Sequence, residues 1–476
     1  MLFNSQTFFV FFLIVYLLYL ISDHKWQNRL LLVASYVFYG WWDWRFLSLI
    51  GISTVVDYIF ALKIAGENDE EKRKKYLAIS ACSNFGMLGF FKYFNFFSGS
   101  FSDLMQVFGW KPDPVTLNIV LPVGISFYTF QTMSYVIDVY RKELPATRKF
   151  LDFALFISFF PQLVAGPIER AKHLLPQILA PRILNPEKFY EGCYLILWGL
   201  FQKVFVADNL AKIVDPVFAS PDTPNGVLVL LVSYAFAFQV FADFAGYSDI
   251  ARGLGKCMGF DIMINFNNPF FSANPQEFWQ RWHISLSSWL RDYVYVPLGG
   301  NRKGPACTLK NIMITMILGG LWHGAAWTYV LWGAYHGFLL VIHRFLKPVL
   351  DRIRMPERSI AGKLWWGLRV AIFFHLWCFG MLLFRSQTVH QFLQMMRAIL
   401  WNTHLSLASG VSLALQQLLF FTGLLVLIQT VQYLKKDLTF ILRSPLILRA
   451  AFYYVFFYLI IFWSENAYRE FIYFQF

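Results

Sequence analysis

The sequence is poor in charged residues. Only 14% of its 476 residues are Asp, Glu, Lys or Arg, whereas an average soluble domain carries about 25%. Apolar residues make up 57%, including 53 Phe, 24 Tyr and 17 Trp, which is more aromatic surface than soluble cores of this size can hide. The apolar runs are continuous and do not alternate as the strands of a membrane barrel would. The composition therefore excludes a soluble protein and predicts an all-α polytopic membrane protein.

Acidic residues are scarcer than basic ones, 28 against 41, which leaves a net charge of +13. In a membrane protein this excess is typical of basic loops kept on the cytoplasmic side, so we expect the lipid bilayer and no nucleic acid as a partner. No charged side chain precedes residue 6, whereas Lys25 and Arg29 follow the first apolar run, and the loop 434–449 is basic. Both termini are therefore predicted to be extracytoplasmic.

Cysteines are few, five in all, and scattered without a C-x-x-C pair. They predict neither a disulfide framework nor a zinc site. The sequence also lacks a Walker loop, a G-x-S-x-G motif and an H-E-x-x-H motif. We therefore expect no metal and no bound cofactor. Internal repeats are absent too, and no soluble domain stands apart, so residues 1–476 are predicted to form a single integral-membrane domain.

Thirteen apolar runs approach the length of about 20 residues that a membrane-spanning helix needs. They lie near 6–22, 29–42, 45–65, 77–97, 117–137, 150–166, 189–214, 226–246, 308–326, 327–346, 365–385, 411–433 and 446–463. The stretch 150–180 is interrupted by Pro161, Gly166, Pro167 and Pro176. Breaks at membrane depth are tolerated where they are buried in protein or line a cavity, so this stretch predicts a partial or re-entrant helix.

The segment 265–302 is too polar for a lipid-facing helix and too aromatic for an ordinary loop. Trp279, Trp282 and Trp289 recur at spacings that suit one face of a single helix. The segment is either an anchor at the membrane interface or the lining of a partly hydrated cavity. Three further polar residues among the tryptophans are candidates for such a lining: Arg281, His283 and Arg291.

His323 lies in the middle of the apolar, glycine-rich stretch MITMILGGLWHGAAWTYVLWGAYHG, residues 313–337. An ionisable residue at membrane depth is a candidate functional residue by default, and histidine is a natural general base near neutral pH. Such a base could activate a hydroxyl group against an acyl donor. The alternative is a neutral histidine hydrogen-bonded within a helix bundle. His336 is a weaker candidate.

Five long motifs resemble the membrane-bound O-acyltransferase (MBOAT) family, in particular its bacterial alginate and peptidoglycan O-acetylation subgroup. They are PVGISFYTFQTMSYVIDVYR (122–141), FFPQLVAGPIER (159–170), FADFAGYSDIARGLG (241–255), FWQRWHISLSSWLRDYVYVPLGGNRKG (278–304) and LGGLWHGAAWTYVLWGAYHG (318–337). The resemblance implies a ring of about 11–13 transmembrane helices, with re-entrant helices, around a central funnel or tunnel. Residues 120–340 would form its catalytic core.

The resemblance also implies roles for individual residues. His323, in the W-H-G motif, matches the catalytic histidine of the family, and His283 matches a second histidine that lines the same tunnel. Asp243 and Tyr247, in FADFAGYSD, either belong to a structural polar network or line the tunnel. The complete set of candidate tunnel residues is Trp279, Arg281, Trp282, Arg291, Trp322, Asp243 and Tyr247.

The chain ends in FIYFQF, which fits an F-x-Y-x-x-F motif formed by Phe471, Tyr473 and Phe476 within the tail 464–476. In the family subgroup that the sequence resembles, such a tyrosine carries the acyl group as an intermediate. A phenol pKa of about 10 against about 6.5 for histidine means that proton transfer must accompany attack. The alternative is an aromatic end that wedges into the helix bundle.

These features together predict an enzyme of the bacterial cytoplasmic (inner) membrane. It would pass an acetyl group from a cytoplasmic thioester, acetyl-CoA, through Tyr473 to an extracytoplasmic SGNH or serine-hydrolase-like acetyltransferase. That partner would O-acetylate a cell-envelope polysaccharide such as peptidoglycan or alginate. Three alternatives stay open at this point: D-alanyl transfer to teichoic acid, a transporter or flippase, and a non-catalytic scaffold. Transporters often contain internal repeats, and none is visible here.

Overall fold

The computed structural model describes residues 1–110, 112–220, 225–353, 355–356, 359–403, 410–464 and 469–472. Within these ranges every regular element is helical and no strand occurs, which confirms the predicted all-α class. Contacts between residues divide the chain into two compact units. The first unit comprises Met1–Cys193 and Ala251–Met263, and the second comprises Tyr194–Ile250 and Ile264–Phe476.

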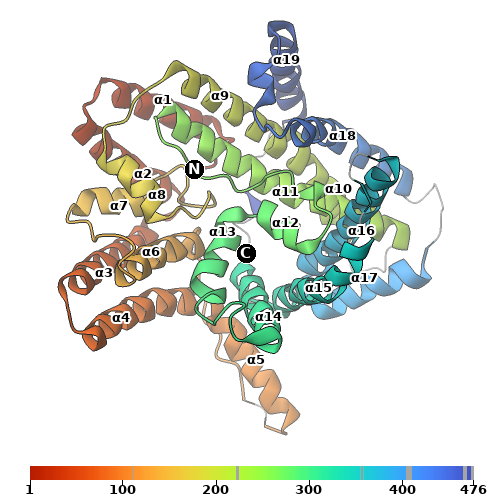
Figure 1. Cartoon of the computed structure of the whole chain (residues 1–476), viewed down its shortest axis with the longest axis horizontal. Coiled ribbons are helices and arrows are strands. Elements are labelled where there is room, and N and C mark those ends of the chain that lie inside the picture. Colours follow the sequence, from red (N-terminus) through yellow and green to blue (C-terminus); the bar gives the residue numbers. More distant parts are fainter. Residues whose placement is uncertain are drawn as a thin grey trace. The chain divides into compact units, whose positions relative to one another are not determined.

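The first unit contains most of the N-terminal helices (Figure 1). They are α1 (Gln6–Ile21), α2 (His24–Asp43), η1 (Trp44–Phe46), α3 (Leu47–Gly66), α4 (Glu70–Leu88), η2 (Gly89–Tyr93), α5 (Phe94–Val107), α6 (Ile125–Tyr140), α7 (Phe150–Ser158) and α8 (Ala171–Leu179). Two long helices have residues in both units: α9 (Pro186–Leu200) and α11 (Gly226–Cys257).

The second unit contains the remaining helices. They are η3 (Phe201–Ala207), α10 (Asp208–Ala219), η4 (Pro269–Phe271), α12 (Pro275–Arg281), α13 (Ile284–Leu290), η5 (Arg291–Tyr295), α14 (Gly304–His323), α15 (Trp327–Arg352), α16 (Ile360–Arg385), α17 (Val389–Trp401), α18 (Val411–Lys435), η6 (Phe440–Arg443) and α19 (Leu446–Trp463).

Five helical stretches among the described residues are long and apolar enough to cross a membrane. They are His24–Gly66, Gly226–Cys257, Ile360–Arg385, Val411–Lys435 and Leu446–Trp463, and Gln6–Ile21 is a shorter apolar helix. Length and composition therefore agree with a membrane protein that crosses the bilayer several times. The total of 11–13 transmembrane helices stays a prediction.

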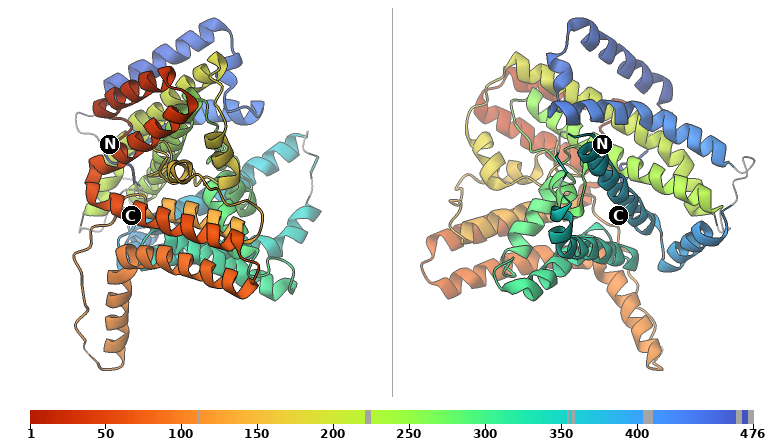
Figure 2. Two further views of the ribbon diagram at one scale, coloured as in Figure 1. Left: turned by 90° about the vertical axis from the view of Figure 1, so that its left-hand side faces the viewer. Right: turned by 45° about the vertical axis from the view of Figure 1, so that its right-hand side comes forward.

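A buried polar cluster joins α3 and α4, which run beside α6 in the first unit (Figure 2). The Asp57 carboxylate accepts hydrogen bonds from Ser80 Oγ at 2.5 Å and from Asn84 Nδ2 at 2.8 Å. Ser53 Oγ donates to the amide oxygen of Asn84 at 2.6 Å. Between apolar helices such bonds hold neighbours together, because hydrophobic burial alone does not distinguish protein from lipid.

The predicted interruption of 150–180 is present. Helix α7 ends at Ser158, shortly before Pro161, and helical structure resumes only at Ala171. Proline cannot donate the next helical hydrogen bond and disfavours helical geometry in the residue before it. Pro176 was expected to break the chain as well, and that expectation is wrong, since α8 continues through Pro176 to Leu179.

Helices α14 and α15 pack backbone against backbone in the second unit (Figure 1). A Cβ atom built on Gly320 would lie 2.2 Å from the Tyr329 carbonyl oxygen, and one built on Gly333 would lie 2.3 Å from the Met316 oxygen. Only glycine fits at either position. This small-residue crossing, a common device between membrane helices, fixes the turn that joins the two helices.

Candidate active site

His323 is the last residue of α14, and a short turn, 324–326, leads from it into α15. The observed break therefore lies close to the predicted boundary between the apolar runs 308–326 and 327–346. The helix ends because Gly324 adopts an extended backbone (φ −167°, ψ 158°). A Cβ atom on Gly324 would lie 2.1 Å from Cε2 of Tyr329, so the missing side chain lets the Tyr329 ring close over the turn.

The His323 side chain is enclosed by aromatic rings. Its ring centroid lies 5.0 Å from that of Trp332 on α15, 5.3 Å from Phe384 on α16 and 5.1 Å from the adjacent Trp322. All three contacts are edge-to-face, and His323 is 4% exposed. Three helices thus hold the imidazole in a largely water-free setting.

His323 also lines a cavity of about 140 Å³ within the second unit. Two other predicted site residues, Trp279 and Arg291, line the same cavity. Most of the remaining wall is apolar: Leu286, Ser287, Leu290, Tyr295, Ile312, Thr315, Met316, Gly319, Trp332 and Leu340. The space beside His323 therefore suits a small apolar group such as a short acyl chain, with one cationic side chain, that of Arg291, on the wall.

His283 is fully buried and lies between two short helices in a left-handed conformation (φ 43°). The expectation of one continuous helical face through Trp279, Trp282 and Trp289 is therefore wrong. Asn265 accounts for the break, because its backbone oxygen accepts from Ile284 N at 3.0 Å and its side-chain oxygen accepts from Ser285 N at 3.2 Å. These bonds satisfy the first amide groups of α13, as a helix start requires.

A tryptophan lies between the two candidate histidines. The Trp322 ring centroid is 5.7 Å from the His283 ring and 5.1 Å from the His323 ring. His283 also packs edge-to-face on Phe244 of α11, at 4.6 Å. His283 is not among the residues that line the cavity beside His323, and the Trp322 ring packs against both histidines.

The other tryptophan and arginine candidates lie around this centre. Trp282 packs on Trp377 at 4.6 Å in the aromatic core, and Arg281 pairs with Glu277 at 2.9 Å and covers the Tyr433 ring. Arg291 pairs with the neighbouring Asp292 at 2.8 Å. Of these, Arg291 alone is a lining residue of the His323 cavity.

Asp243 is part of a buried ion-pair cluster centred on Lys203. Lys203 Nζ lies 2.7 Å from Asp243 Oδ1 and 2.8 Å from Asp208 Oδ1, and Lys203 is only 1% exposed. Sequence reasoning overlooked Lys203. The signal that could have found it is a single lysine within the apolar run FQKVFVA, since isolated charges in apolar spans mark functional or paired residues.

The same cluster holds the chain near its C-terminus. Asp243 Oδ2 accepts a hydrogen bond from the backbone N–H of Ile472 at 2.7 Å, and Lys203 Nζ donates to the Glu470 carbonyl at 3.3 Å. Phe471 is buried, with its ring 4.5 Å from Lys203 Nζ and 4.7 Å from the Tyr247 ring. Asp243 and Tyr247 thus contact the tail. Two further residues of the predicted motif, Tyr473 and Phe476, lie outside the described residues.

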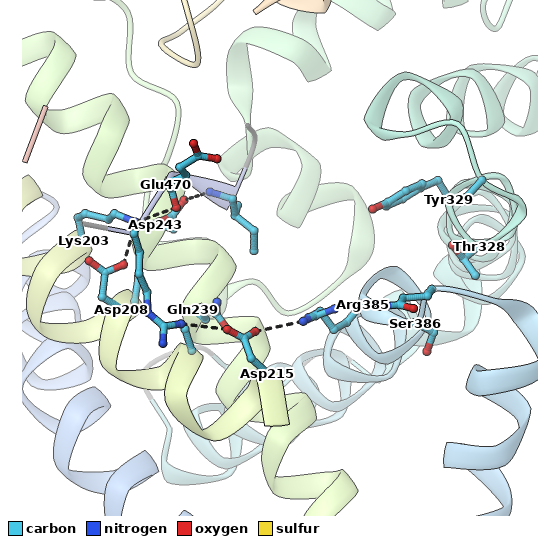
Figure 3. A pocket seen from close by; sticks show the side chains of 16 residues that line it. Lys203, Asp208, Asp215, Gln239, Asp243, Thr328, Tyr329, Arg385, Ser386 and Glu470 are labelled. Atoms are coloured by element: carbon cyan, nitrogen blue, oxygen red, sulfur yellow. Dashed lines mark hydrogen bonds and ion pairs between the residues drawn. The ribbon is translucent and has the colours of Figure 1, made fainter. Parts of the chain in front are cut away.

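Beside this tail segment is a second, polar cavity of about 490 Å³ (Figure 3). Lys203 and Asp208 lie on one side of it, and Thr328 and Tyr329, which follow His323 closely in the chain, lie on the opposite side. Its complete lining is Lys203, Ala207, Asp208, Ala211, Asp215, Gln239, Asp243, Ala326, Thr328, Tyr329, Arg385, Ser386, Gln387, Arg469, Glu470 and Ile472.

No group of three or more His, Cys, Asp or Glu side chains that could hold a metal ion occurs within the described part of the chain. The donors assembled here are imidazoles, indoles and one guanidinium around an apolar space. Such a set can hold an acyl group and move a proton.

Comparison with known proteins agrees with this arrangement. The family described as "MBOAT, membrane-bound O-acyltransferase family" matches residues 131–386. A "Probable alginate O-acetylase" of Pseudomonas putida is 45% identical over 392 residues, which is 82% of this chain and 78% of that protein. The "Peptidoglycan O-acetyltransferase" of Helicobacter pylori is 36% identical, covering 72% of this chain and 70% of its own.

A more distant relative has a different acyl group in its name. The "Teichoic acid D-alanyltransferase" of Bacillus subtilis is 30% identical over 57% of this chain and 71% of its own length. The motifs, the helical membrane fold and these matches lead to one assignment. The chain belongs to the membrane-bound O-acyltransferase family and is an acyltransferase of the membrane.

Proposed function

We propose that this enzyme transfers an acetyl group from cytoplasmic acetyl-CoA to Tyr473 of its own tail, with His323 as general base. The observation that carries the proposal is the arrangement around the turn 324–326. His323, before the turn, lines one cavity. Thr328 and Tyr329, after the turn, line a second cavity whose wall also includes residues of the tail segment 469–472. One turn thus connects the wall that carries the base, His323, with the wall that includes the tail, and this arrangement suits transfer of an acyl group to the tail.

The first transfer balances as follows. The Tyr473 phenol oxygen attacks the thioester carbonyl carbon while its proton moves to the His323 imidazole. The carbon–sulfur bond then breaks, and the coenzyme A thiolate takes the proton back from the imidazolium. The products are free thiol and an acetyl ester on Tyr473, and His323 is regenerated as the neutral base.

Proton transfer has to be concerted with attack. Ordinary phenol and imidazole pKa values differ by about 3.5, which corresponds to about 5 kcal/mol for forming free phenolate and imidazolium. Edge-to-face packing of Trp332 and Phe384 on His323 supports this role, because it restricts the orientation of the imidazole and excludes water that would hydrolyse the donor. Through Trp322, His283 would orient the ring of His323 or the donor.

The second transfer takes place outside the cytoplasm. A serine of an SGNH or serine-hydrolase-like acetyltransferase attacks the ester carbonyl, the Tyr473 phenolate leaves and takes up a proton, and the acetyl group moves on to a hydroxyl of a cell-envelope polysaccharide. Relatives named as alginate and peptidoglycan O-acetylating proteins support an acetyl donor and a polysaccharide acceptor. Because the family is one of acyltransferases, the transporter and scaffold hypotheses are set aside.

The proposal includes the organisation of the chain. Residues 1–476 act as one acyltransferase, with 120–340 as the catalytic core. The enzyme lies in the bacterial inner membrane with both termini outside the cytoplasm, so that the donor and the partner enzyme reach the tyrosine from opposite sides.

The test uses purified full-length protein in nanodiscs with radiolabelled acetyl-CoA. We expect wild type to retain label covalently, and His323→Ala and Tyr473→Phe to lose it. The control is His375→Ala, since His375 is an exposed histidine whose ring is hydrogen-bonded to the Ala371 carbonyl of its own helix. Label that persists in Tyr473→Phe would overturn the tail relay. Label from a D-alanyl carrier protein and none from acetyl-CoA would overturn the acetyl donor.

A further inference from the structure

We infer that Lys203 and Asp243 are positioning residues that anchor the C-terminal segment 469–472 and thereby set where the next residue, Tyr473, meets the acyl donor. The inference rests on the proposed function, because it takes Tyr473 as the acyl carrier. It assigns a task to a charged cluster that the transfer chemistry itself does not use.

The contacts fall on three consecutive tail residues. Lys203 Nζ donates to the Glu470 carbonyl at 3.3 Å and lies 4.5 Å from the Phe471 ring centroid, and Asp243 accepts from Ile472 N at 2.7 Å. Phe471 and Ile472 are 1% and 6% exposed. A segment bound through its carbonyl, its side chain and its amide is fixed in both position and direction.

The buried cluster carries more negative than positive charge, which is unusual for a cluster that only stabilises the fold. One ammonium, on Lys203, faces two carboxylates, those of Asp208 and Asp243, and all three side chains are at most 11% exposed. Burying ions costs several kcal/mol each, and replacing buried ion pairs by apolar residues is often neutral or stabilising. Binding of the tail accounts for the second carboxylate. Asp243 accepts a hydrogen bond from Lys203 at Oδ1 and one from the Ile472 amide at Oδ2.

The anchor limits the reach of the following residue. Consecutive Cα atoms are about 3.8 Å apart, so a displacement of Ile472 is passed on to the residue that follows it in the chain. Misplacing a reacting group by about 1 Å can cost about 100-fold in rate. Loss of the anchor should therefore slow acyl loading by about 10- to 100-fold without weakening donor binding.

An exposed ion pair away from the tail supplies a control. Arg443 Nη1 lies 3.1 Å from Asp437 Oδ2, and the Arg443 side chain is 81% exposed. Exposed pairs contribute about 0–1 kcal/mol. Arg443 does not line the cavity beside the tail, so we expect tail exchange and labelling in Arg443→Gln to equal those of wild type.

Two variants remove the anchor from its two sides. Asp243→Ala deletes the acceptor and leaves Lys203 paired with Asp208, so no buried charge is stranded. Ile472→Pro deletes the donor N–H in the tail and leaves the helices untouched. The tail variant keeps the test decisive if Asp243→Ala fails to fold.

The measurements are hydrogen–deuterium exchange of the C-terminal peptide and acetyl label on Tyr473, with the KM for acetyl-CoA and thermal unfolding alongside. We expect exchange to accelerate at least about tenfold in both variants, and labelling to fall about 10- to 100-fold at unchanged KM and melting temperature. The inference would be overturned if hydrogen–deuterium exchange of the C-terminal peptide in the variants were as slow as in wild type. It would also be overturned if exchange were faster but acetyl labelling of Tyr473 stayed at the wild-type level. If wild type shows slow tail exchange but no label on Tyr473, the proposed relay fails and the anchor stands.

Discussion

Replacing Gly333 with alanine should displace His323 although the two residues are on different helices. The added Cβ atom would lie 2.3 Å from the Met316 oxygen, 3.0 Å from the Ile317 Cα atom and 3.1 Å from the Gly320 Cα atom. All three are backbone atoms of α14, so no side chain can rotate away. The only relief is separation of α14 from α15.

The size of the displacement follows from the contact. Non-bonded atoms settle at about 3.5 Å or more, so a contact of 2.3 Å requires the helices to part by about 1 Å at this crossing. Overpacking of this kind costs about 1–3 kcal/mol. His323 sits at the end of α14 and Trp332, its ring partner, precedes Gly333, so the catalytic geometry shifts with the helices. A shift of about 1 Å predicts a loss of about 100-fold in labelling rate.

The assay compares the rate of acetyl labelling and the thermal midpoint of purified Gly333→Ala with those of wild type. Gly423→Ala is the matched control, since a Cβ atom on this helical glycine meets nothing within 4 Å, and it should be neutral or slightly stabilising. Wild-type labelling and stability in Gly333→Ala would refute the reasoning that backbone contact between α14 and α15 positions the base.

Two further predictions concern the turn and a surface histidine. Gly324→Ala, whose Cβ would lie 2.1 Å from the Tyr329 ring, should lower the labelling rate and leave the melting temperature close to that of wild type. A large fall in the melting temperature would contradict a local effect on the turn. His173 donates a hydrogen bond to the Glu169 carboxylate, which raises the pKa of His173. This pair therefore stabilises the fold fully below about pH 6.5 and loses its effect as pH rises through the raised pKa. The melting-temperature difference between wild type and His173→Gln should therefore shrink from pH 6 to pH 8.5, and a constant difference would exclude the pair as its source.

The class of the fold could be predicted from the sequence because it depends on local composition. Long apolar runs define membrane helices wherever they occur, and the interruption of 150–180 follows from the chemistry of proline in the chain itself. Pro176 shows the limit of that reasoning. It lies inside α8, where the surrounding packing overrides the local preference.

The break at His283 could not be predicted from the sequence. His283 adopts a positive φ in a segment with no glycine beside it, because Asn265, distant in sequence, binds the first amides of α13. The break after His323 lies near the predicted boundary between the runs 308–326 and 327–346. Its close packing, in which Gly324 leaves room for the Tyr329 ring, is visible only in the structure.

Residues of the candidate site could be predicted from the sequence only where they lie within a recognisable motif. His323, Trp279 and Arg291 lie around one cavity, as residues drawn from two neighbouring motifs. An isolated lysine in the apolar run FQKVFVA signals a functional or paired residue. Its contact with the tail could not be predicted, because Asp243 and the Glu470 carbonyl are far from Lys203 along the chain.

The most direct test of the account is a single-turnover reaction with acetyl-CoA, quenched at intervals, in which mass spectrometry of the C-terminal peptide locates the acetyl group. The account predicts an acetyl ester on Tyr473 that forms in wild type before any appears on the partner enzyme, and that forms in His323→Ala at less than about one hundredth of that rate. An acetyl group on another residue, or equal rates in wild type and His323→Ala, would contradict it.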